Sequence, residues 1–220
     1  MIIRVNFAFL REGSSDNGLI PHLRDLLVRA GADEAFGTSR PYLGTVESKL
    51  RALAKEAGTI DLVFVHRDAD GPDSEPRRDE VAKAAQRALP KASCIAVVPV
   101  QELEAWLLLD ELAIRAVVGQ PHGNASLDIP AVKAIESTGR PKELLERACL
   151  LASGTSGRRR VKEKKMFSQR RRVLLERLDP AGPISSLPAW QMLERDIEEY
   201  VSGLLASGGG QSSSNANSLG

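Results

Sequence analysis

The sequence predicts an α/β fold, in which a small, mostly parallel sheet is flanked by helices and followed by a helical C-terminal extension. Apolar, β-rich segments alternate with amphipathic helical segments through the first half of the 220-residue chain, which is the pattern of parallel strands joined by helices. After about residue 111 the strand-like segments stop, and short helical segments follow between Gly and Pro residues. The length suits one domain with an appendage.

The strands are expected where runs of apolar and β-branched residues end in polar or glycine-rich turns. These runs cover residues 2–10, 60–67 and 93–99, with a weaker run near 39–43. In an open α/β sheet, ligands collect at the carboxyl ends of the strands, where loops can carry side chains without disturbing the core. The polar residues that follow the strands are therefore the first candidates for a site.

Helices are expected where apolar residues recur every three or four positions. One runs from Leu19 to Ala30 behind a polar cap, one begins after Thr45, one covers about 78–89, and one begins within 99–110. The extension is expected to hold four more, near 131–138, 141–152, 162–178 and 188–206.

These elements divide the chain into three parts. Residues 1–115 are expected to form the α/β domain, residues 116–206 a helical extension packed on it, and residues 207–220 a disordered tail. The tail is rich in Gly, Ser and Asn, and such a segment cannot bury enough apolar surface to fold.

Composition narrows the class of protein. With 42% hydrophobic and 27% charged residues, the chain has the composition of a globular domain. No apolar run approaches the roughly 18 residues that span a bilayer, and the N-terminus lacks the pattern of a signal peptide. A cytoplasmic location without a membrane partner is expected. Cys94 and Cys149 lie in apolar segments, so we expect core residues and no disulfide or metal pair.

Carboxylates follow two of the predicted strands. Glu12 comes after the first strand, in a polar run that ends at Asp16, and Asp68 and Asp70 come after the strand at 60–67. Oxygen ligands at one sheet edge are what Mg²⁺ prefers, so these residues predict a divalent metal site. The alternative for Asp68 and Asp70 is a simple turn, in which aspartate is common.

Three further carboxylates are candidate ligands. Glu102 and Glu104 lie in the first turn of the helix after the last strand, where the alternative is a favourable interaction with the helix N-terminus. Asp16 could bind metal or could cap the first helix. The expected metal set is therefore Glu12, Asp16, Asp68, Asp70, Glu102 and Glu104.

Together, these acidic blocks resemble the Toprim domain of topoisomerases, DnaG-type primases and overcoming-lysogenization-defect nucleases. More narrowly, they are similar to an uncharacterised Toprim-like family that is found near ATPases in anti-phage or mobile loci. The likeness covers roughly residues 3–200 and is carried by the Glu12 run, by His66–Asp70, by Pro99–Asp110 and by Pro141–Leu145.

The resemblance implies a Mg²⁺- or Mn²⁺-dependent nuclease in a defence or DNA-repair assembly with an AAA- or ABC-type ATPase. It implies that Asp68 and Asp70 are metal ligands and that Glu12 is a ligand or the acid/base. It also likens Asp16 to the second acidic position of a two-metal site, in which the ions activate water and stabilise the leaving oxygen. Topoisomerase activity is not expected, because the chain lacks a tyrosine in the separate nucleophile domain that topoisomerases need.

Basic residues gather in one part of the extension. Between Arg158 and Arg172 there are nine basic residues and one acidic residue, Glu163. We expect nucleic acid, DNA rather than RNA, to bind this basic strip beside the acidic pocket, although a solvated helix face is the alternative. The expected contacts are Arg67 at the strand end and, in the strip, Arg158, Arg159, Arg160, Lys162, Lys164 and Lys165.

Two other functions stay open on the sequence. The acidic site could serve a metal-dependent phosphoryl or nucleotidyl transferase that acts on a small nucleotide. The chain could also be a non-catalytic subunit that binds a partner ATPase or nucleic acid. Titration of divalent metal in the presence of nucleic-acid substrates separates these functions.

Overall fold

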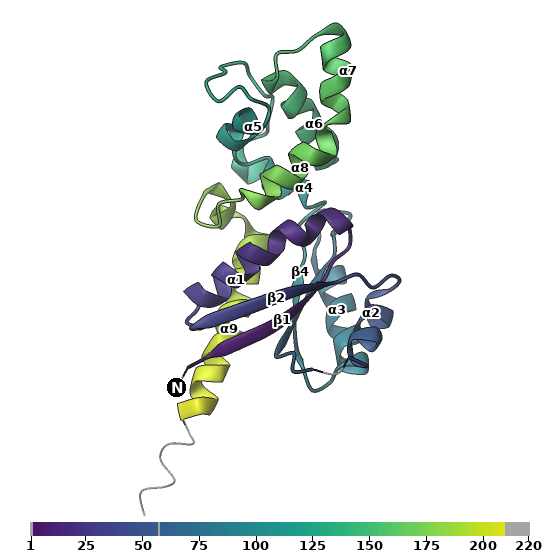
Figure 1. The fold of residues 1–220 in the computed structure, drawn as a ribbon, viewed down its shortest axis with the longest axis vertical. Coiled ribbons are helices and arrows are strands. Elements are labelled where there is room, and N and C mark those ends of the chain that lie inside the picture. Colours follow the sequence, from purple (N-terminus) through teal and green to yellow (C-terminus); the bar gives the residue numbers. More distant parts are fainter. Residues whose placement is uncertain (1, 57, 210–220) are drawn as a thin grey trace, which may run out of the picture.

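A four-stranded, all-parallel sheet forms the centre of the computed structural model, which describes residues 2–56 and 58–209 (Figure 1). The strand order across the sheet is β2-β1-β3-β4. The strands are β1 (Arg4–Leu10), β2 (Glu34–Arg40), β3 (Leu62–His66) and β4 (Ser93–Val97). The predicted α/β class, with a parallel sheet, flanking helices and a helical C-terminal region, is therefore confirmed.

Helices join each strand to the next and cover both faces of the sheet. They are α1 (Leu19–Arg29), α2 (Val46–Leu53) and α3 (Glu75–Ala88). Successive strand side chains point to opposite faces, so Phe7 and Phe9 pack in the core under α1, whereas Ala8 and Leu10 pack in the core under α2 and α3. These two cores fix the strand ends and therefore the loops that follow them.

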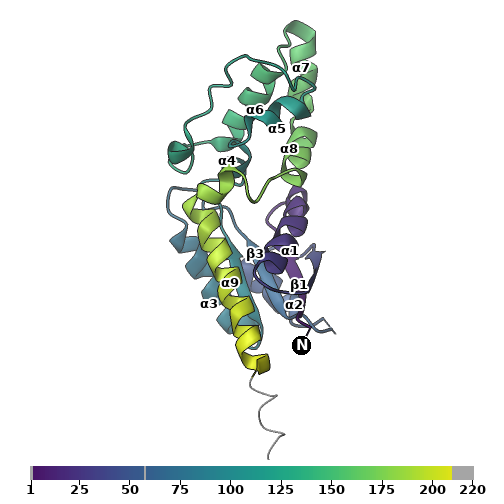
Figure 2. The same ribbon diagram turned by 90° about the vertical axis from the view of Figure 1, so that its left-hand side faces the viewer.

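The last helix, α9 (Pro188–Gly209), returns to the sheet and does not stay with the extension. It packs against α1 and β4 (Figure 2), and its residues Ile197 and Val201 are buried in the same core as α1. The α/β layers are thus completed by residues that were expected in the extension 116–206. An amphipathic pattern predicts that a helix has a buried face, but it does not say which part of the chain covers that face.

Strand β2 lies earlier than the strand expected near 39–43. Its sequence, Glu-Ala-Phe-Gly-Thr-Ser-Arg, contains a glycine in the middle, which weakens any strand pattern. The glycine is needed for packing, since a Cβ atom added at Gly37 would lie 2.1 Å from Cζ of Phe7 on β1. Because the close approach of this aromatic ring requires a glycine inside the strand, the sequence pattern of β2 is weak.

The remaining helices form a helical region beyond the carboxyl end of the sheet (Figure 1). They are α4 (Glu104–Leu107), α5 (Glu111–Val117), α6 (Pro141–Ala152), α7 (Gly157–Lys165) and α8 (Phe167–Glu176). The expected helix 131–138 is only a short 3₁₀ turn, and the expected helix 162–178 is two helices that meet at Met166. The rings of Trp106 on α4 and Trp190 on α9 pack edge-on with centroids 5.1 Å apart, so this region shares a core with the sheet.

The two cysteines belong to the packed interior, as expected. Both are free, Cys149 is buried and Cys94 is half-buried. Burial raises the pKa of the Cys94 thiol to about 12 and that of Cys149 to about 11. Both side chains are therefore neutral thiols at physiological pH.

The C-terminal helix extends into the segment that was expected to be a tail. Helix α9 ends at Gly209, whereas the tail was expected to begin at residue 207. The rest of the expected tail, 210–220, lies outside the described residues. Within the part of the chain that the structure describes, no helix has the length and apolar character needed to cross a membrane.

Candidate active site

Three loops meet at the carboxyl ends of the parallel strands, and we call this region the carboxyl edge. They follow β1, β3 and β4, and the 3₁₀ turn Ser14–Gly18 in the first of them contacts α8. Backbone hydrogen bonds join the other two loops: the N–H of Ala69 donates to the carbonyl of Pro99 at 3.0 Å, the N–H of Asp70 to the carbonyl of Gln101 at 2.9 Å, and the N–H of Gln101 to the carbonyl of Gly71 at 3.0 Å. The site is thus built at the strand ends, where open α/β sheets bind ligands.

Glu12 and Asp68 lie together at this edge. The backbone N–H of Asp68 donates to Oε2 of Glu12 at 2.7 Å, which ties the loop after β1 to the loop after β3. Oδ1 of Asp68 accepts a hydrogen bond from the N–H of Leu103 at 2.9 Å, just before α4. The two acidic loops that were expected at neighbouring strand ends are therefore joined, with the Glu12 carboxylate against the Asp68 backbone, and these bonds engage one oxygen of each carboxylate.

Asp70 is turned toward α3. Its φ of 56° lies in the left-handed region, which is uncommon for residues other than glycine, and its Oδ2 pairs with the guanidinium of Arg77 at 2.8 Å. Gln101, which accepts the Asp70 N–H, is also left-handed with φ of 64°. Because the Asp70 side chain is 59% exposed and already paired, it forms the rim of the site in this arrangement.

A buried ion network lies behind the carboxylate pair. Asp16 and Glu104, each 3% exposed, are bridged by the guanidinium of Arg171 on α8. Nη2 of Arg171 lies 3.2 Å from Oδ1 of Asp16, and Nε lies 2.7 Å from Oε1 of Glu104. Oδ2 of Asp16 also accepts the N–H of Gly13 at 2.6 Å. Both oxygens of Asp16 are thus engaged: Oδ2 caps the 3₁₀ turn that Gly13 precedes, which agrees with the expected capping alternative, and Oδ1 anchors Arg171.

His66, the last residue of β3, connects this network to Asp68. It is 1% exposed, with Nδ1 3.2 Å from Oδ2 of Asp16 and Nε2 3.3 Å from Oδ1 of Asp68, the latter without hydrogen-bond alignment. Burial alone would lower the pKa of His66, but the two carboxylates raise it to about 9. Burial alone would raise the pKa of Asp16, but His66, Gly13 and Arg171 hold it at about 2. At neutral pH the pair is therefore an imidazolium and a carboxylate.

This pair predicts that the metal-free protein loses stability as the pH rises above neutrality. The pKa of His66 is raised from 6.5 to about 9, so its contribution is complete below pH 6.5 and is lost as the pH rises through about 9. Urea unfolding in EDTA should show a fall in the free energy of unfolding of about 3 kcal/mol across this range. An equal free energy of unfolding at pH 6.5 and pH 9 would contradict it.

Several other groups with shifted pKa values affect the stability of the protein outside the range from pH 6.5 to pH 9. Burial lowers the pKa of His22, so this residue affects stability below pH 6.5. The pKa of Asp16 is lowered from 3.8 to about 2, so its contribution is lost as the pH falls through about 2. The thiol pKa values are raised from 9.0, so these groups act above pH 9. The lowered pKa of His22 reduces stability as the pH falls below 6.5, and the raised pKa of His66 reduces it as the pH rises above 6.5, so stability should be greatest near pH 6.5.

Glu102 and Glu104 have different partners. Glu104 is buried against Arg171, whereas Glu102 is half-buried and its Oε2 accepts the N–H of Lys142 at the start of α6, at 3.2 Å. Burial raises the pKa of Glu102, and the carboxylates of Glu104 and Asp68 raise it further. Of the two glutamates that the sequence left open, Glu102 is therefore the one available to a ligand at the carboxyl edge.

The donor chemistry of the carboxyl edge suits a divalent ion. Mg²⁺ is commonly bound through one or two carboxylates and keeps several waters, so Glu12 and Asp68, each with one oxygen outside the hydrogen bonds described above, are the candidate ligands. The other expected ligands are engaged by Arg171 or Arg77. Across residues 2–56 and 58–209, no group of three or more His, Cys, Asp or Glu side chains is arranged as a ready metal cage.

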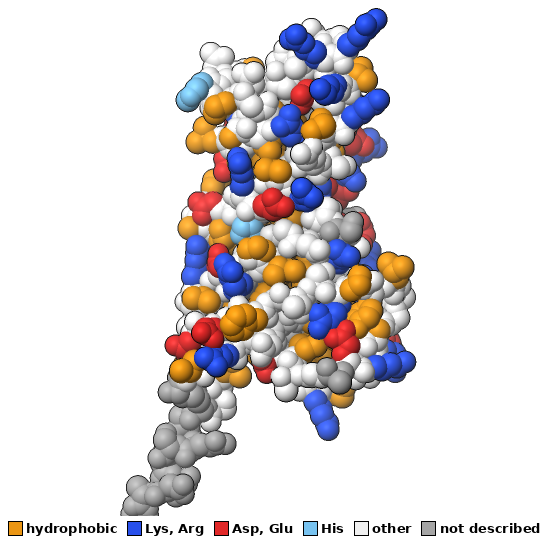
Figure 3. Space-filling model, viewed as in Figure 1, with side chains coloured by type: hydrophobic (Ala, Val, Ile, Leu, Met, Phe, Trp, Pro, Cys, Tyr) orange, Lys and Arg blue, Asp and Glu red, His pale blue; other side chains and the backbone are white. Residues whose placement is uncertain are grey.

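The basic strip lies apart from this edge, which corrects the expectation that all of 158–172 lies beside the acidic pocket. Helix α7 packs on α6 and α8 at the end of the helical region away from the sheet (Figure 1), and Figure 3 shows Lys and Arg side chains gathered there. The chain turns at Met166, so Arg171 on α8 is the member that reaches the site. The exposed members on α7 are Arg158, Arg159, Arg160, Lys162, Lys164 and Lys165.

Two cations at the site were not anticipated from the sequence. Arg171 was placed in the basic strip that was expected to bind nucleic acid, but it shares the buried face of α8 with Leu174 and Leu175. Lys49 likewise occupies an apolar position of α2, three residues after Val46. A basic residue inside an apolar helical stripe was the available signal in both cases.

Comparison of the chain with protein-family models, with curated proteins and with solved structures finds no match. The chemistry of the carboxyl edge therefore has to carry the functional conclusion.

Proposed function

We propose that this chain is a Mg²⁺- or Mn²⁺-dependent nuclease that hydrolyses phosphodiester bonds of DNA in the cytoplasm. The observation that supports this most is the 2.7 Å hydrogen bond from the backbone N–H of Asp68 to the Glu12 carboxylate, which joins the two acidic loops at the ends of adjacent strands. The resemblance to Toprim nucleases implies the same combination of a Glu after the first strand and an Asp-X-Asp block.

The residues of the carboxyl edge can divide the chemistry among them. Glu12 and Asp68 would hold the ion, which when bound supplies charge stabilisation and lowers the pKa of bound water. The Glu12 oxygen that the Asp68 N–H leaves free would accept a proton from the attacking water. Burial raises the pKa of Glu102, which suits a carboxyl group that donates a proton to the leaving oxygen.

The buried network supports this division by fixing Asp68. The Leu103 N–H and the His66 imidazolium both lie against Oδ1 of Asp68, so the orientation of its carboxylate is set before any ligand arrives. Arg171 extends this support to α8. Such preorganised charged groups lose little to reorganisation during a reaction.

A cleavage assay with the full chain tests the proposal. Single-stranded DNA, duplex DNA and RNA are incubated with Mg²⁺, with Mn²⁺ or with EDTA, and products are separated on denaturing gels. We expect cleavage of DNA with either metal and none in EDTA. Turnover of nucleoside triphosphates without cleavage would favour the small-nucleotide transferase. No reaction of either kind, alone or with a partner ATPase, would favour the non-catalytic subunit.

We further propose that α7 binds the phosphate backbone of DNA and that an AAA- or ABC-type ATPase accompanies the chain. Helix α7 is exposed and its first turns carry three consecutive arginines. Cations of this kind release counterions from DNA when they bind, which makes affinity depend on salt. Since α7 lies away from the carboxyl edge, it would hold DNA at a distance from the cleaved bond.

Removing the α7 arginines should weaken binding without changing the chemistry. With Arg158, Arg159 and Arg160 replaced by glutamine, the slope of log affinity against log salt should fall by about 0.9 for each phosphate that the variant no longer neutralises. Turnover of bound DNA should not change. Anisotropy titrations over a range of salt measure this, and an unchanged slope would leave α7 as a solvated helix face. The control replaces three exposed arginines of other helices: Arg24, Arg51 and Arg87.

A further inference from the structure

Lys49 is a buried cation beside the carboxyl edge. Lys49 is 7% exposed, and its Nζ donates to the backbone carbonyl of Arg11 at 2.7 Å. Arg11 directly precedes Glu12 in the chain. In the part of the chain that the structure describes, no carboxylate lies within 4.0 Å of this ammonium group. A buried ammonium group without a counter-ion is unfavourable unless another group compensates its charge.

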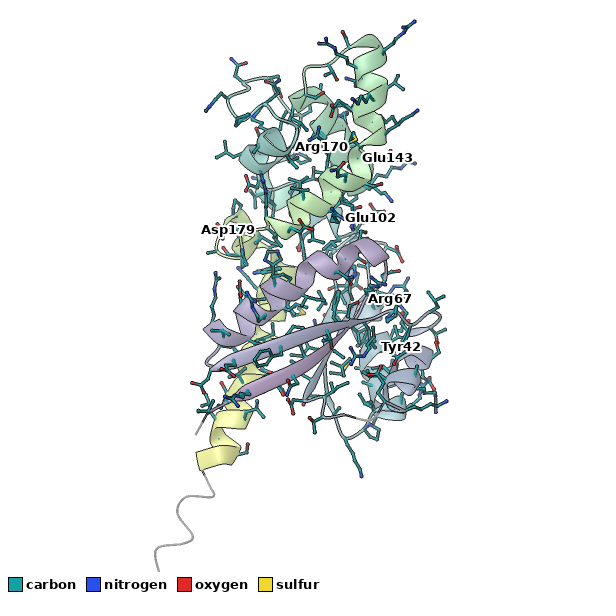
Figure 4. The ribbon with its side chains drawn as sticks, in the orientation of Figure 1. Tyr42, Arg67, Glu102, Glu143, Arg170 and Asp179 are labelled. Carbon is teal, nitrogen blue, oxygen red and sulfur yellow. The ribbon has the colours of Figure 1, made fainter. Side chains whose placement is uncertain are left out.

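Arg67 also lies beside Glu12 and is incompletely paired. Its side chain is 17% exposed, and its Nε is a buried atom with no hydrogen-bond partner. The nearest carboxylate oxygens belong to Glu12, 3.6 Å from Nε, and to Glu80, 3.8 Å from Nη1. These distances exceed the 2.7–2.9 Å typical of charge-assisted hydrogen bonds. Figure 4 shows Arg67 where the α/β layers meet the helical region, on the same side as Glu102.

The two cations near Glu12 influence each other. Burial lowers the pKa of Lys49, the carboxylates of Glu12 and Asp16 raise it, and Arg67 and Arg11 lower it. Lys49 and Arg67 therefore lie close enough to repel, and both lie near Glu12 without a close ion pair to it. An anion with several oxygens would reduce the repulsion between Lys49 and Arg67, because it can accept hydrogen bonds from both cations at once.

We propose that Lys49 and Arg67 form a phosphate subsite next to Glu12 that takes a phosphodiester group of a polynucleotide. The planar guanidinium of Arg67 can bind two phosphate oxygens, and the ammonium of Lys49 supplies a point charge. The subsite adjoins the Glu12 and Asp68 pair, so a phosphate held there lies beside the proposed site of hydrolysis. The assignment of the anion to a substrate rests on the proposed function, but the anion site itself does not.

Binding measurements in EDTA test the subsite without requiring any cleavage. The probes are inorganic phosphate, compared with chloride at equal ionic strength in thermal unfolding, and a fluorescein-labelled single-stranded DNA oligonucleotide in anisotropy titrations. The variants are Lys49→Met and Arg67→Met. The matched control is Lys55→Met, which removes an exposed lysine just after the same helix.

We expect phosphate to raise the melting temperature of the parent protein and of the Lys55→Met control. Lys49→Met should lose most of that shift and bind the oligonucleotide about tenfold more weakly, because one charge-assisted hydrogen bond to the phosphate is removed. Its own melting temperature should rise, because methionine fills the buried space without a charge. Arg67→Met should lose the same phosphate shift.

Three results would overturn the subsite. The first is a parent protein that phosphate does not stabilise. The second is a Lys49→Met protein that melts lower and keeps the full phosphate shift, which would make the lysine a purely structural donor to Arg11. The third, a lost phosphate shift with unchanged oligonucleotide affinity, would replace the polynucleotide with a small phosphorylated ligand. A chain that binds phosphate through Lys49 but cleaves nothing would instead contradict the proposed nuclease function.

Discussion

Replacement of Arg171 by methionine is expected to lower the free energy of unfolding by about 3–5 kcal/mol. Arg171 lies between Asp16 and Glu104, which are each 3% exposed and lie 3.2 and 2.7 Å from its guanidinium. Methionine fills much of the volume but leaves both carboxylates buried without their counter-ion. Removing one partner of a buried ion pair lowers the free energy of unfolding more than replacing both partners by apolar groups. Urea unfolding at neutral pH measures the loss.

The adjacent residue supplies the control for this experiment. Arg172 lies next in the same helix, but its side chain is 62% exposed and its nearest carboxylate, on Glu176, is 3.6 Å away. Arg172→Met should change the free energy of unfolding by less than about 1 kcal/mol, as for other exposed ion pairs. Equal losses in the two variants would show that the Arg171 network does not hold the helical region to the sheet. A double variant, Arg171→Met with Glu104→Gln, should recover part of the stability because one buried charge is removed.

Replacement of Glu12 by glutamine is expected to reduce metal-dependent DNA cleavage by about 10²–10⁴-fold, the usual contribution of a general base, with loss of a metal ligand adding to it. The amide oxygen of glutamine can still accept the N–H of Asp68, so the fold and the hydrogen bond between the loops should be kept. The amide cannot take a proton from water and carries no charge to hold an ion. Cleavage rates at saturating Mn²⁺ measure the effect.

A glutamate at the opposite edge of the sheet serves as the matched control. Glu34 begins β2 and pairs on the surface with Arg4, the first residue of β1. Glu34→Gln removes the same charge from the amino end of the sheet and should cleave DNA at the parent rate. If Glu12→Gln also cleaves at the parent rate, Glu12 has no part in the chemistry.

The elements of the site that come from strand ends could be predicted from the sequence. A run of apolar residues that ends in a carboxylate predicts a strand. In a parallel sheet it also predicts that the carboxylate lies at the carboxyl ends of the strands. Glu12 and Asp68 were expected together for that reason, and a hydrogen bond now joins their loops. Helices α1, α2 and α6 were also expected close to their observed positions, since their apolar spacing is regular.

The elements that depend on distant partners could not be predicted. Asp16 is paired by Arg171, which lies 155 residues further along the chain, and no local pattern encodes that pairing. The orientation of Asp70 follows from its left-handed backbone and from Arg77, which the Asp-X-Asp spacing does not determine. Strand β2 was displaced in the prediction because Gly37 makes room for Phe7 on another strand.

Calorimetric titration of the metal-free protein with Mn²⁺ tests the central claim most directly, because it asks whether Glu12 and Asp68 form a metal site at all. The titration compares the parent chain, Asp68→Asn, and the control Asp79→Asn, whose carboxylate is exposed on α3 and pairs with Lys83. We expect saturable binding in the parent and in the control, and loss of most of the affinity in Asp68→Asn. Equal Mn²⁺ affinity in all three proteins would contradict a metal site at the carboxyl edge.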